Sequence, residues 1–317
     1  MIIRFASAAS AVAMFACLSA PALAAEPEAV EITVATETEG DEAIAVRAIE
    51  PIDLATASRA DEEETSPITL SGSATIITDY RFRGISQTDK GMAVESGITL
   101  THESGFYVAT WGSNLAGWGT FGGADVELDL VAGYAFAVGE GKLDAGLTWY
   151  MYPSGFDETD FAELYAKLSG SIGPLGLTAG VAYAPPQEAL GKVFLTGAAA
   201  AAGLPDDPGD KEDNLYISGD AVYGIADTPI SLRAHIGYSD GNAGLGPNGT
   251  SVAPTGTYFD WLLAVDATVL ERLTLSVSYV DTDISDAESA YLLPNFQQVG
   301  GGSIADATIL FSVTAAF

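Results

Sequence analysis

Residues 303–317 read S-I-A-D-A-T-I-L-F-S-V-T-A-A-F, and their side chains alternate between two faces. One face carries only apolar residues, namely Ala307, Ile309, Phe311, Val313, Ala315 and Phe317. The other face carries Asp306, Thr308, Ser312 and Thr314, with Leu310 and Ala316 as apolar exceptions. A two-residue repeat of this kind predicts a β-strand with one apolar and one mostly polar face. A soluble sheet can contain such a strand, so the fold depends on what the rest of the chain repeats.

The same alternation recurs throughout the chain upstream of this stretch. Together with the stretch itself it predicts twelve strands, at 68–82, 92–101, 106–113, 125–136, 143–152, 161–171, 175–183, 214–223, 230–238, 258–269, 273–280 and 304–317. Glycine is abundant, with 35 residues among 317, and apolar residues are spread evenly. This composition is typical of many alternating strands rather than of a packed helical core.

The connections between these strands alternate strictly between short and long. Five are tight hairpins, around Ser104-Gly105, Gly139-Glu140, Gly173-Pro174, Asp227-Thr228 and Glu271-Arg272. The connections at 184–213, 239–257 and 281–303 are long and contain Gly, Pro or Ala runs. A β-sandwich has no reason to sort its loops in this way. The pattern therefore predicts an all-β fold, a single antiparallel transmembrane β-barrel over residues 67–317, with short periplasmic turns and long extracellular loops.

The N-terminal region predicts export and then a spacer. Residues 1–24 have a positive Arg4, an apolar stretch and an Ala22-Leu23-Ala24 cleavage signature, so we expect a signal peptide that is removed. Cleavage there removes Cys17, the one cysteine, so no disulfide is expected. Residues 25–66 contain thirteen Asp or Glu against two Arg and predict a disordered, acidic periplasmic spacer.

Composition excludes several classes of protein. The formal net charge of −31 argues against a nucleic-acid partner. No apolar run after the signal peptide reaches the length of a transmembrane helix. What remains is a membrane protein that spans the bilayer with strands, or a soluble sheet.

Charged residues of the predicted strands fall on one phase of the alternation, which places them in the lumen. The candidate pore-lining residues are Asp79, Arg81, Arg83, Glu95, Asp125, Glu127, Asp129, Asp144, Glu163, Lys167, Asp220, Arg233, His235, Asp260 and Asp266. Because acids dominate, an open lumen would favour cations or neutral solutes. Alternatively the basic residues pair with the acids and hold a nearly filled interior together. Aromatic residues at strand ends, Tyr80 and Phe82 among them, predict belts at the two membrane interfaces.

Catalytic and metal sites find little support in the sequence. His235 and Asp220, with a lumen serine, could be drawn as a triad, but no positional motif accompanies them. The acidic loop around Asp207, Asp210 and Asp213 could hold Ca²⁺, although its spacing fits no known cation loop. We therefore expect no enzyme activity, no cofactor and no metal site.

The run T-I-I-T-D-Y-R-F-R-G-I-S-Q-T at 75–88 resembles the opening of the TorF family of proteobacterial putative porins. The W-Y-M-Y-P segment at 149–153 and the F-A-E-L-Y segment at 161–165 are also similar. The resemblance covers about residues 68–317 and implies an outer-membrane barrel with channel activity but no catalytic set. Asp79, Arg81, Arg83 and Gln87 match its motif without an assigned chemistry.

These observations predict a porin-like channel in the bacterial outer membrane, for passive diffusion of small hydrophilic solutes with a weak cation preference. The expected partners are outer-membrane lipid and lipopolysaccharide, small solutes, and the barrel-assembly machinery, through the C-terminal strand that ends at Phe317. A non-conducting structural or surface-binding barrel is the main alternative, and an outer-membrane hydrolase is the third.

Overall fold

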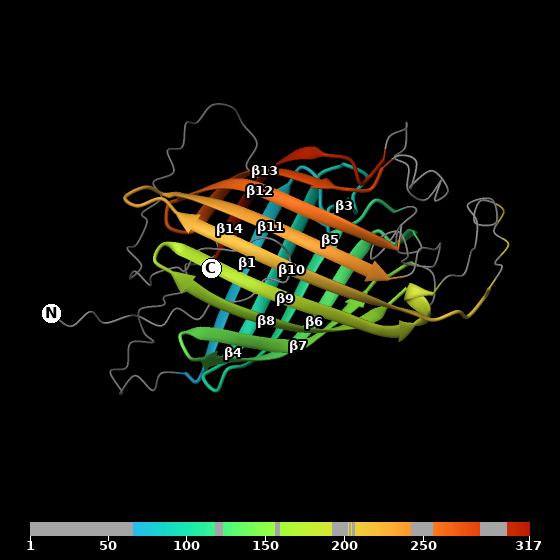
Figure 1. Ribbon diagram of the computed structural model, residues 1–317, viewed down its shortest axis with the longest axis horizontal. Helices are drawn as coiled ribbons and strands as arrows, with labels where there is room; N and C mark the ends of the chain where they lie inside the picture. Colours follow the sequence, from blue (N-terminus) through green and yellow to red (C-terminus); the bar gives the residue numbers. More distant parts are fainter. Residues whose placement is uncertain are drawn as a thin grey trace, which may run out of the picture. The chain divides into compact units, whose positions relative to one another are not determined.

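A computed structural model describes residues 66–117, 123–155, 159–191, 202, 204, 207–241, 256–285 and 303–317. The predicted signal peptide and all of the predicted spacer except residue 66 lie outside the described residues. Twelve antiparallel strands form a closed barrel (Figure 1). They are β1 (Ile68–Ile77), β4 (Ala93–His102), β5 (Phe106–Asn114), β6 (Val126–Val138), β7 (Gly141–Met151), β8 (Phe161–Ile172), β9 (Leu175–Gln187), β10 (Glu212–Gly224), β11 (Ile230–Gly241), β12 (Thr257–Val269), β13 (Leu273–Thr282) and β14 (Thr308–Ala316). No helix in the described part of the chain is long and apolar enough to cross a membrane.

Each barrel strand pairs with its neighbours in sequence, and β1 pairs with β14 to close the ring. The five tight hairpins predicted from the sequence are all present, and they lie at one end of the barrel, here called the turn end. The longer connections lie at the opposite end, the loop end. The strands cross the view at an angle on the near and far walls, as tilted barrel strands do (Figure 1). The prediction of a single twelve-stranded antiparallel barrel is therefore confirmed.

The alternation seen in the sequence separates the outside of the wall from the inside. In β14, Ile309, Phe311 and Val313 are exposed, whereas Leu310 and Thr314 are buried. Exposed large apolar side chains continue around the outside of the barrel in every wall strand. Trp149 and Tyr279 on the outside lie toward the loop end and Tyr134 and Tyr223 toward the turn end, as the predicted aromatic belts require. An apolar outer surface of this extent is stable only when lipid covers it.

The first strand is shorter than the sequence predicts, and this changes the lumen. β1 ends at Ile77, and the chain that follows, residues 78–92, folds into the barrel over most of its length as a segment that we call the inward connection. Within it β2 (Arg81–Phe82) and β3 (Ile85–Ser86) form a small hairpin. The turn between them places Arg83 at φ 48° and Gly84 at φ 81°. The alternation continues through this segment although the backbone no longer follows the wall.

The predicted placement of Tyr80 and Phe82 in an aromatic belt is wrong. They are only 2% and 6% exposed, so they belong to the interior and not to an aromatic belt. They pack in an apolar cluster inside the loop end, which we call the inner aromatic cluster. Its buried members are Tyr80, Phe82, Ala93, Leu115, Ala124, Tyr150, Tyr152, Phe161, Ala184, Ala189 and Leu190. Ala189 and Leu190 come from the short 3₁₀ helix η3 (Glu188–Leu190), so the connection after β9 also contributes to this filling.

The lumen changes from packed to accessible along its axis. On β8 the inward side chains Phe161, Glu163 and Tyr165 are buried, whereas Lys167 and Ser169 are partly exposed. On β10 the same order holds, from buried Asn214 and Tyr216 to partly exposed Ser218 and Asp220. Around β8 to β10 the loop-end half of the lumen is therefore filled by protein, and the turn-end half is partly open to solvent. On other strands inward side chains stay buried toward the turn end as well, among them Tyr107, Asp144, Arg233 and Asp266.

Candidate functional site in the barrel lumen

Arg83 anchors the inward connection to the opposite wall. Its Nη2 donates to Glu163 Oε2 on β8 at 2.6 Å, and its Nη1 donates to Asn214 Oδ1 on β10 at 2.8 Å. The guanidinium lies over the ring of Tyr216, 4.1 Å from its centroid. The Tyr258 hydroxyl donates to the backbone oxygen of Arg83 at 3.0 Å. Four wall residues thus hold one arginine in the middle of the lumen.

The charge of Arg83 is favoured in this place. Burial opposes it, but the carboxylate of Glu163 outweighs burial, so the pKa of Arg83 lies above its ordinary value. Both side chains of the pair are nearly inaccessible, at 6% and 1% exposed. A buried pair of this geometry is costly to break, because the partner left behind stays charged and desolvated.

Asp79 holds the inward connection in its own fold. Its carboxylate pairs with Arg81 Nε at 2.7 Å and accepts hydrogen bonds from the hydroxyls of Ser86 and Thr88. Arg81 Nη1 donates to the backbone oxygens of Gly84 and Asp306, the latter beside β14. Asp79 and Arg81 were expected in a wall strand; their role in the structure is to fold the segment that fills the barrel.

Three acids in the loop-end half make no ion pair within the described part of the chain: Glu95 on β4 and Glu127 and Asp129 on β6. The Tyr152 hydroxyl donates to Glu127 Oε1 at 3.2 Å, but Glu127 Oε2 and both oxygens of Asp129 have no hydrogen-bond partner among the described residues. Burial, together with the nearby carboxylate of Glu127, raises the pKa of the Tyr80 hydroxyl well above its ordinary value. This side of the lumen therefore has an excess of acid.

A second polar group lies halfway along the lumen, between β5, β7 and β8. The Tyr107 hydroxyl donates to Asp144 Oδ1 at 2.8 Å and also contacts the hydroxyl of Tyr165. The Lys167 ammonium lies 5.7 Å from the centroid of the Tyr165 ring. In the filled-interior alternative Lys167 pairs with lumen acids; in the structure it makes no ion pair with any described residue.

His235 on β11 lies between two carboxylates, Asp220 on β10 and Asp260 on β12. Its Nδ1 is 2.7 Å from Asp220 Oδ1, while its Nε2 is 3.3 Å from Asp260 and 2.9 Å from the Tyr216 hydroxyl. The triad drawn from the sequence requires a serine at Nε2, and Tyr216 and Asp260 occupy that position instead. The His235–Asp220 contact itself joins residues directly opposite on β11 and β10.

Arg233 and Asp266 form the third buried basic–acidic pair, with Arg233 Nε 3.1 Å from Asp266 Oδ2. Arg83, Arg81 and Arg233 thus pair as the filled-interior alternative expects, and Lys167 does not. Asp125 alone among the expected lumen residues is exposed and lies before β6 begins, on the connection from β5. Among the described residues, no group of three His, Cys, Asp or Glu side chains could hold a metal ion.

Sequence reasoning missed the uncharged polar residues that complete these contacts. Tyr107, Tyr216 and Asn214 are hydrogen-bonded to charged side chains, Tyr165 contacts the Tyr107 hydroxyl, and Tyr258 donates to the backbone oxygen of Arg83. Each of them except Tyr107 lies an even number of residues from an expected lumen residue on its own strand. The alternation therefore also predicts these uncharged polar residues to face the lumen, but only charged side chains were assigned there.

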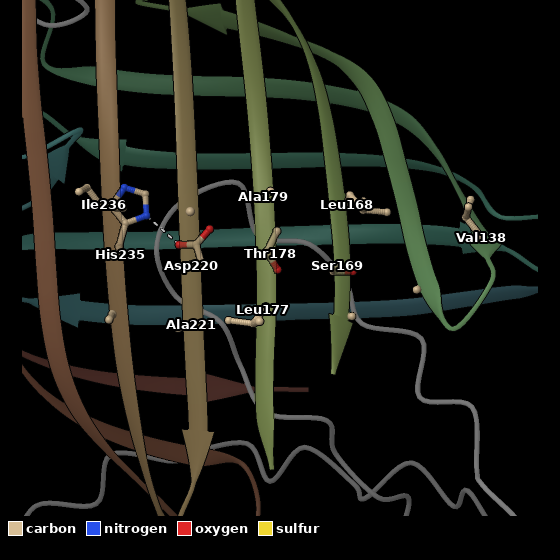
Figure 2. A pocket seen from close by; sticks show the side chains of 14 residues that line it. Val138, Leu168, Ser169, Leu177, Thr178, Ala179, Asp220, Ala221, His235 and Ile236 are labelled. Carbon is tan, nitrogen blue, oxygen red and sulfur yellow. Dashed lines mark hydrogen bonds and ion pairs between the residues drawn. The ribbon is translucent and has the colours of Figure 1, made fainter. Parts of the chain in front are cut away.

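A cavity of about 760 Å³ lies on the outside of the wall (Figure 2). One row of inward-facing residues lines the cavity, and it crosses the paired strands β8 to β11 at Ser169, Thr178, Asp220 and His235. The rows on either side of it face outward and contain the exposed side chains of Leu168, Leu177 and Ile236. The side chains that border the cavity therefore point outward, and between them the cavity reaches the backbone of the inward row. The cavity is a shallow groove in the lipid-facing surface and not part of the lumen.

Comparison with known proteins gives one family and several distant folds. No curated protein matches the chain. Among solved structures, the NanC porin covers 78% of this chain and 99% of its own at 11% identity and a TM-score of 0.47. An outer-membrane channel from Pseudomonas putida F1 covers 78% and 94% at 9% identity and a TM-score of 0.39. OmpT, an outer-membrane protein of Vibrio cholerae, covers 79% and 97% at 11% identity and a TM-score of 0.36.

These likenesses are too distant to carry an argument about function, and none of them tests the TorF name suggested by the motif. The family model that matches residues 61–317 spans the whole barrel. The chain therefore belongs to the family described as bacterial protein of unknown function (Gcw_chp).

Proposed function

We propose that this protein is a channel of the bacterial outer membrane, through which small hydrophilic solutes diffuse passively, and that the inward connection narrows it. The observation that carries the proposal is the lumen itself: a closed barrel with an apolar outside has a charged inside that is partly accessible toward the turn end, beside β8 to β11. A barrel that served only as an anchor would have no need of a solvated, charged half-lumen. The resemblance of residues 75–88 to TorF-type porins supports the same function.

The loop lengths support an orientation for the channel. In outer-membrane barrels short turns face the periplasm and long connections face outward. The accessible half-lumen would then open to the periplasm, and the inward connection and the inner aromatic cluster would lie on the external side, near lipopolysaccharide. Exposed Ile309, Phe311 and Val313 of β14 support recognition of this strand by the barrel-assembly machinery.

A weak cation preference belongs to the proposal. Glu95, Glu127 and Asp129 have no ion pair with described residues, whereas the three arginines of the interior are paired. Uncompensated acids near a constriction raise the local concentration of cations and lower that of anions.

The second candidate is a non-conducting barrel, and one observation favours it. The inner aromatic cluster fills the loop-end half, with Tyr150 and Phe161 stacked at 4.5 Å between ring centroids. If this packing is permanent, no continuous path crosses the barrel, and the long connections become the functional surface.

Conductance of the refolded protein in a planar bilayer separates the two candidates. We expect small steps in the wild type, a reversal potential biased toward cations in a salt gradient, and larger steps when the inward connection is shortened to a Gly-Ser linker over residues 80–90. Folding and insertion are checked by heat-modifiable gel mobility. If the shortened variant is folded and inserted but silent, the channel function is wrong and the barrel is structural.

A further inference from the structure

Lys167 and Asp144 stand directly opposite each other in the pairing of β8 and β7, and both point into the lumen. Opposite charges in such a position are expected to form an ion pair. No ion pair joins them in the described structure. The Lys167 side chain leans instead over β9, where its Cγ lies 3.6 Å from the place that a Cβ of Gly180 would occupy.

The other acids near Lys167 already have partners. The carboxylates that act electrostatically on its ammonium are those of Asp144, Asp220 and Glu163. Glu163 is bound by Arg83 at 2.6 Å, and Asp220 is bound by His235 at 2.7 Å. Only Asp144 remains, and its Oδ1 accepts the hydrogen bond of Tyr107.

Two unsatisfied groups of opposite charge therefore lie in one part of the lumen. The ammonium of Lys167 has no acceptor within the described residues, and Oδ2 of Asp144 is buried without a donor. Asp144 as a whole is 4% exposed. A desolvated charge without a partner costs free energy that a fold normally avoids. The arrangement is satisfied when a ligand supplies an anion to Lys167 and a cation to Asp144.

We propose that Lys167 and Asp144 form a binding site for a small zwitterion such as an α-amino acid. The ammonium of Lys167 binds the ligand's carboxylate, and Oδ2 of Asp144 accepts a hydrogen bond from its ammonium. A simple anion or a simple cation would leave one of the two residues unpaired, which gives the zwitterion its advantage. The inference rests on the proposed function, since it names the class of solute that the channel would take.

The Lys167 side of the site is open toward the turn end, whereas Asp144 is covered, so a ligand has to uncover Asp144 Oδ2 when it binds. Lys167 and its neighbours Gly180 and Ser218 are partly exposed, whereas Glu163, two inward positions closer to the loop end on β8, is 1% exposed. A solute that enters from the turn end therefore meets this site at the boundary of the packed half, before the inward connection. This is the place where a selective channel would bind its solute.

Calorimetric titration of the folded protein in detergent tests the site without requiring conduction. The probes are glycine, acetate and methylammonium, at equal ionic strength. We expect saturable binding of glycine that is at least tenfold tighter than binding of either singly charged probe. Lys167→Met and Asp144→Asn should each weaken glycine binding at least tenfold. In Asp144→Asn the amide oxygen can still accept the hydrogen bond of Tyr107, while the NH₂ group takes the place of the unpaired Oδ2.

Lys142→Met is the matched control, because Lys142 is also an inward lysine, on β7 and closer to the turns. Its glycine affinity should equal that of the wild type. Acetate that binds as tightly as glycine would overturn the inference in favour of an anion site, and methylammonium that does so would favour a cation site. If the folded protein binds none of the three, water satisfies both groups and the inference is wrong.

Conductance distinguishes this failure from a failure of the proposed function. A conducting barrel that does not bind glycine contradicts the zwitterion site alone. A silent barrel that binds glycine in a manner dependent on Lys167 and Asp144 contradicts the channel alone.

Discussion

Arg83 and Glu163 are joined at 2.6 Å although the first belongs to a connection and the second to a wall strand on the opposite side of the barrel. The pair fixes residues 78–92 inside the lumen and determines how much of the lumen remains open. Its stability is therefore expected to control both the stability of the barrel and the permeability of its loop-end half.

Substitution Arg83→Gln removes the cation and leaves Glu163 buried without it. Breaking a buried pair in this way typically costs about 3–5 kcal/mol. We expect a loss of this order in the free energy of unfolding, measured with urea from lipid bilayers, and larger conductance steps. Lys90→Gln is the control, because the Lys90–Asp306 pair is long, at 3.9 Å, and exposed. Equal stability of both variants would mean that Arg83 does not hold the connection.

Gly84 is required for space as well as for its backbone conformation. It has φ 81°, and a Cβ there would lie 2.5 Å from Thr282 Cγ2 and 3.0 Å from Asp260 Cβ. Asparagine tolerates positive φ, so Gly84→Asn tests space rather than backbone strain. We expect it to displace the inward connection, seen as increased protease cleavage within residues 78–92 of the inserted protein. Gly139→Asn, at φ 60° with nothing within 4 Å, should behave as the wild type. If both variants resist cleavage, close packing of Gly84 against Thr282 and Asp260 is not needed to hold the inward connection in place.

The lipid-facing wall can be tested with single charges. Leu263 is 59% exposed at the centre of β12, whereas Ile230 is the first residue of β11 at the turn end. An arginine at the bilayer midplane costs roughly 2–4 kcal/mol, and one near the interface about 0–1 kcal/mol. We therefore expect Leu263→Arg to destabilise the barrel in bilayers far more than Ile230→Arg does. A similar cost at both positions would contradict the membrane placement.

The acids without ion pairs should determine charge selectivity. We expect Glu127→Gln combined with Asp129→Asn to reduce the cation bias of the reversal potential, because both carboxylates are buried beside the inward connection. Asp125→Asn serves as the control, since Asp125 is exposed before β6. A bias that follows Asp125 instead would locate selectivity in the external connections.

Local alternation predicted most of the wall correctly, and the reason is physical. In β14 each side chain faces either lipid or the lumen, so two neighbouring residues record the two environments directly. The same rule failed at Tyr80 and Phe82. These residues continue the alternation of β1, but their environment depends on Glu163, Asn214 and Tyr258, which are distant in sequence.

The candidate site shows the same limit. The charged residues of the lumen could be predicted from their phase in the strands, and Asp220 and His235 were correctly placed on neighbouring strands. Which acid each basic residue contacts could not be predicted, since Arg83 reaches the wall only through the inward connection. The unpaired state of Lys167 depends on this as well, because Arg83 occupies Glu163.

The seam between β1 and β14 sets the order of folding events. Thr75 and Thr314 share a hydrogen bond across it at a sequence separation of 239 residues, far greater than that between any other neighbouring strands. The entropy lost on closing a loop grows with its length, so this pairing is the slowest to find. Until β14 arrives, β1 and the nascent sheet present open edges that invite pairing between molecules. A chaperone that shields those edges during export would therefore matter more for the yield of this protein than any single contact in its finished wall.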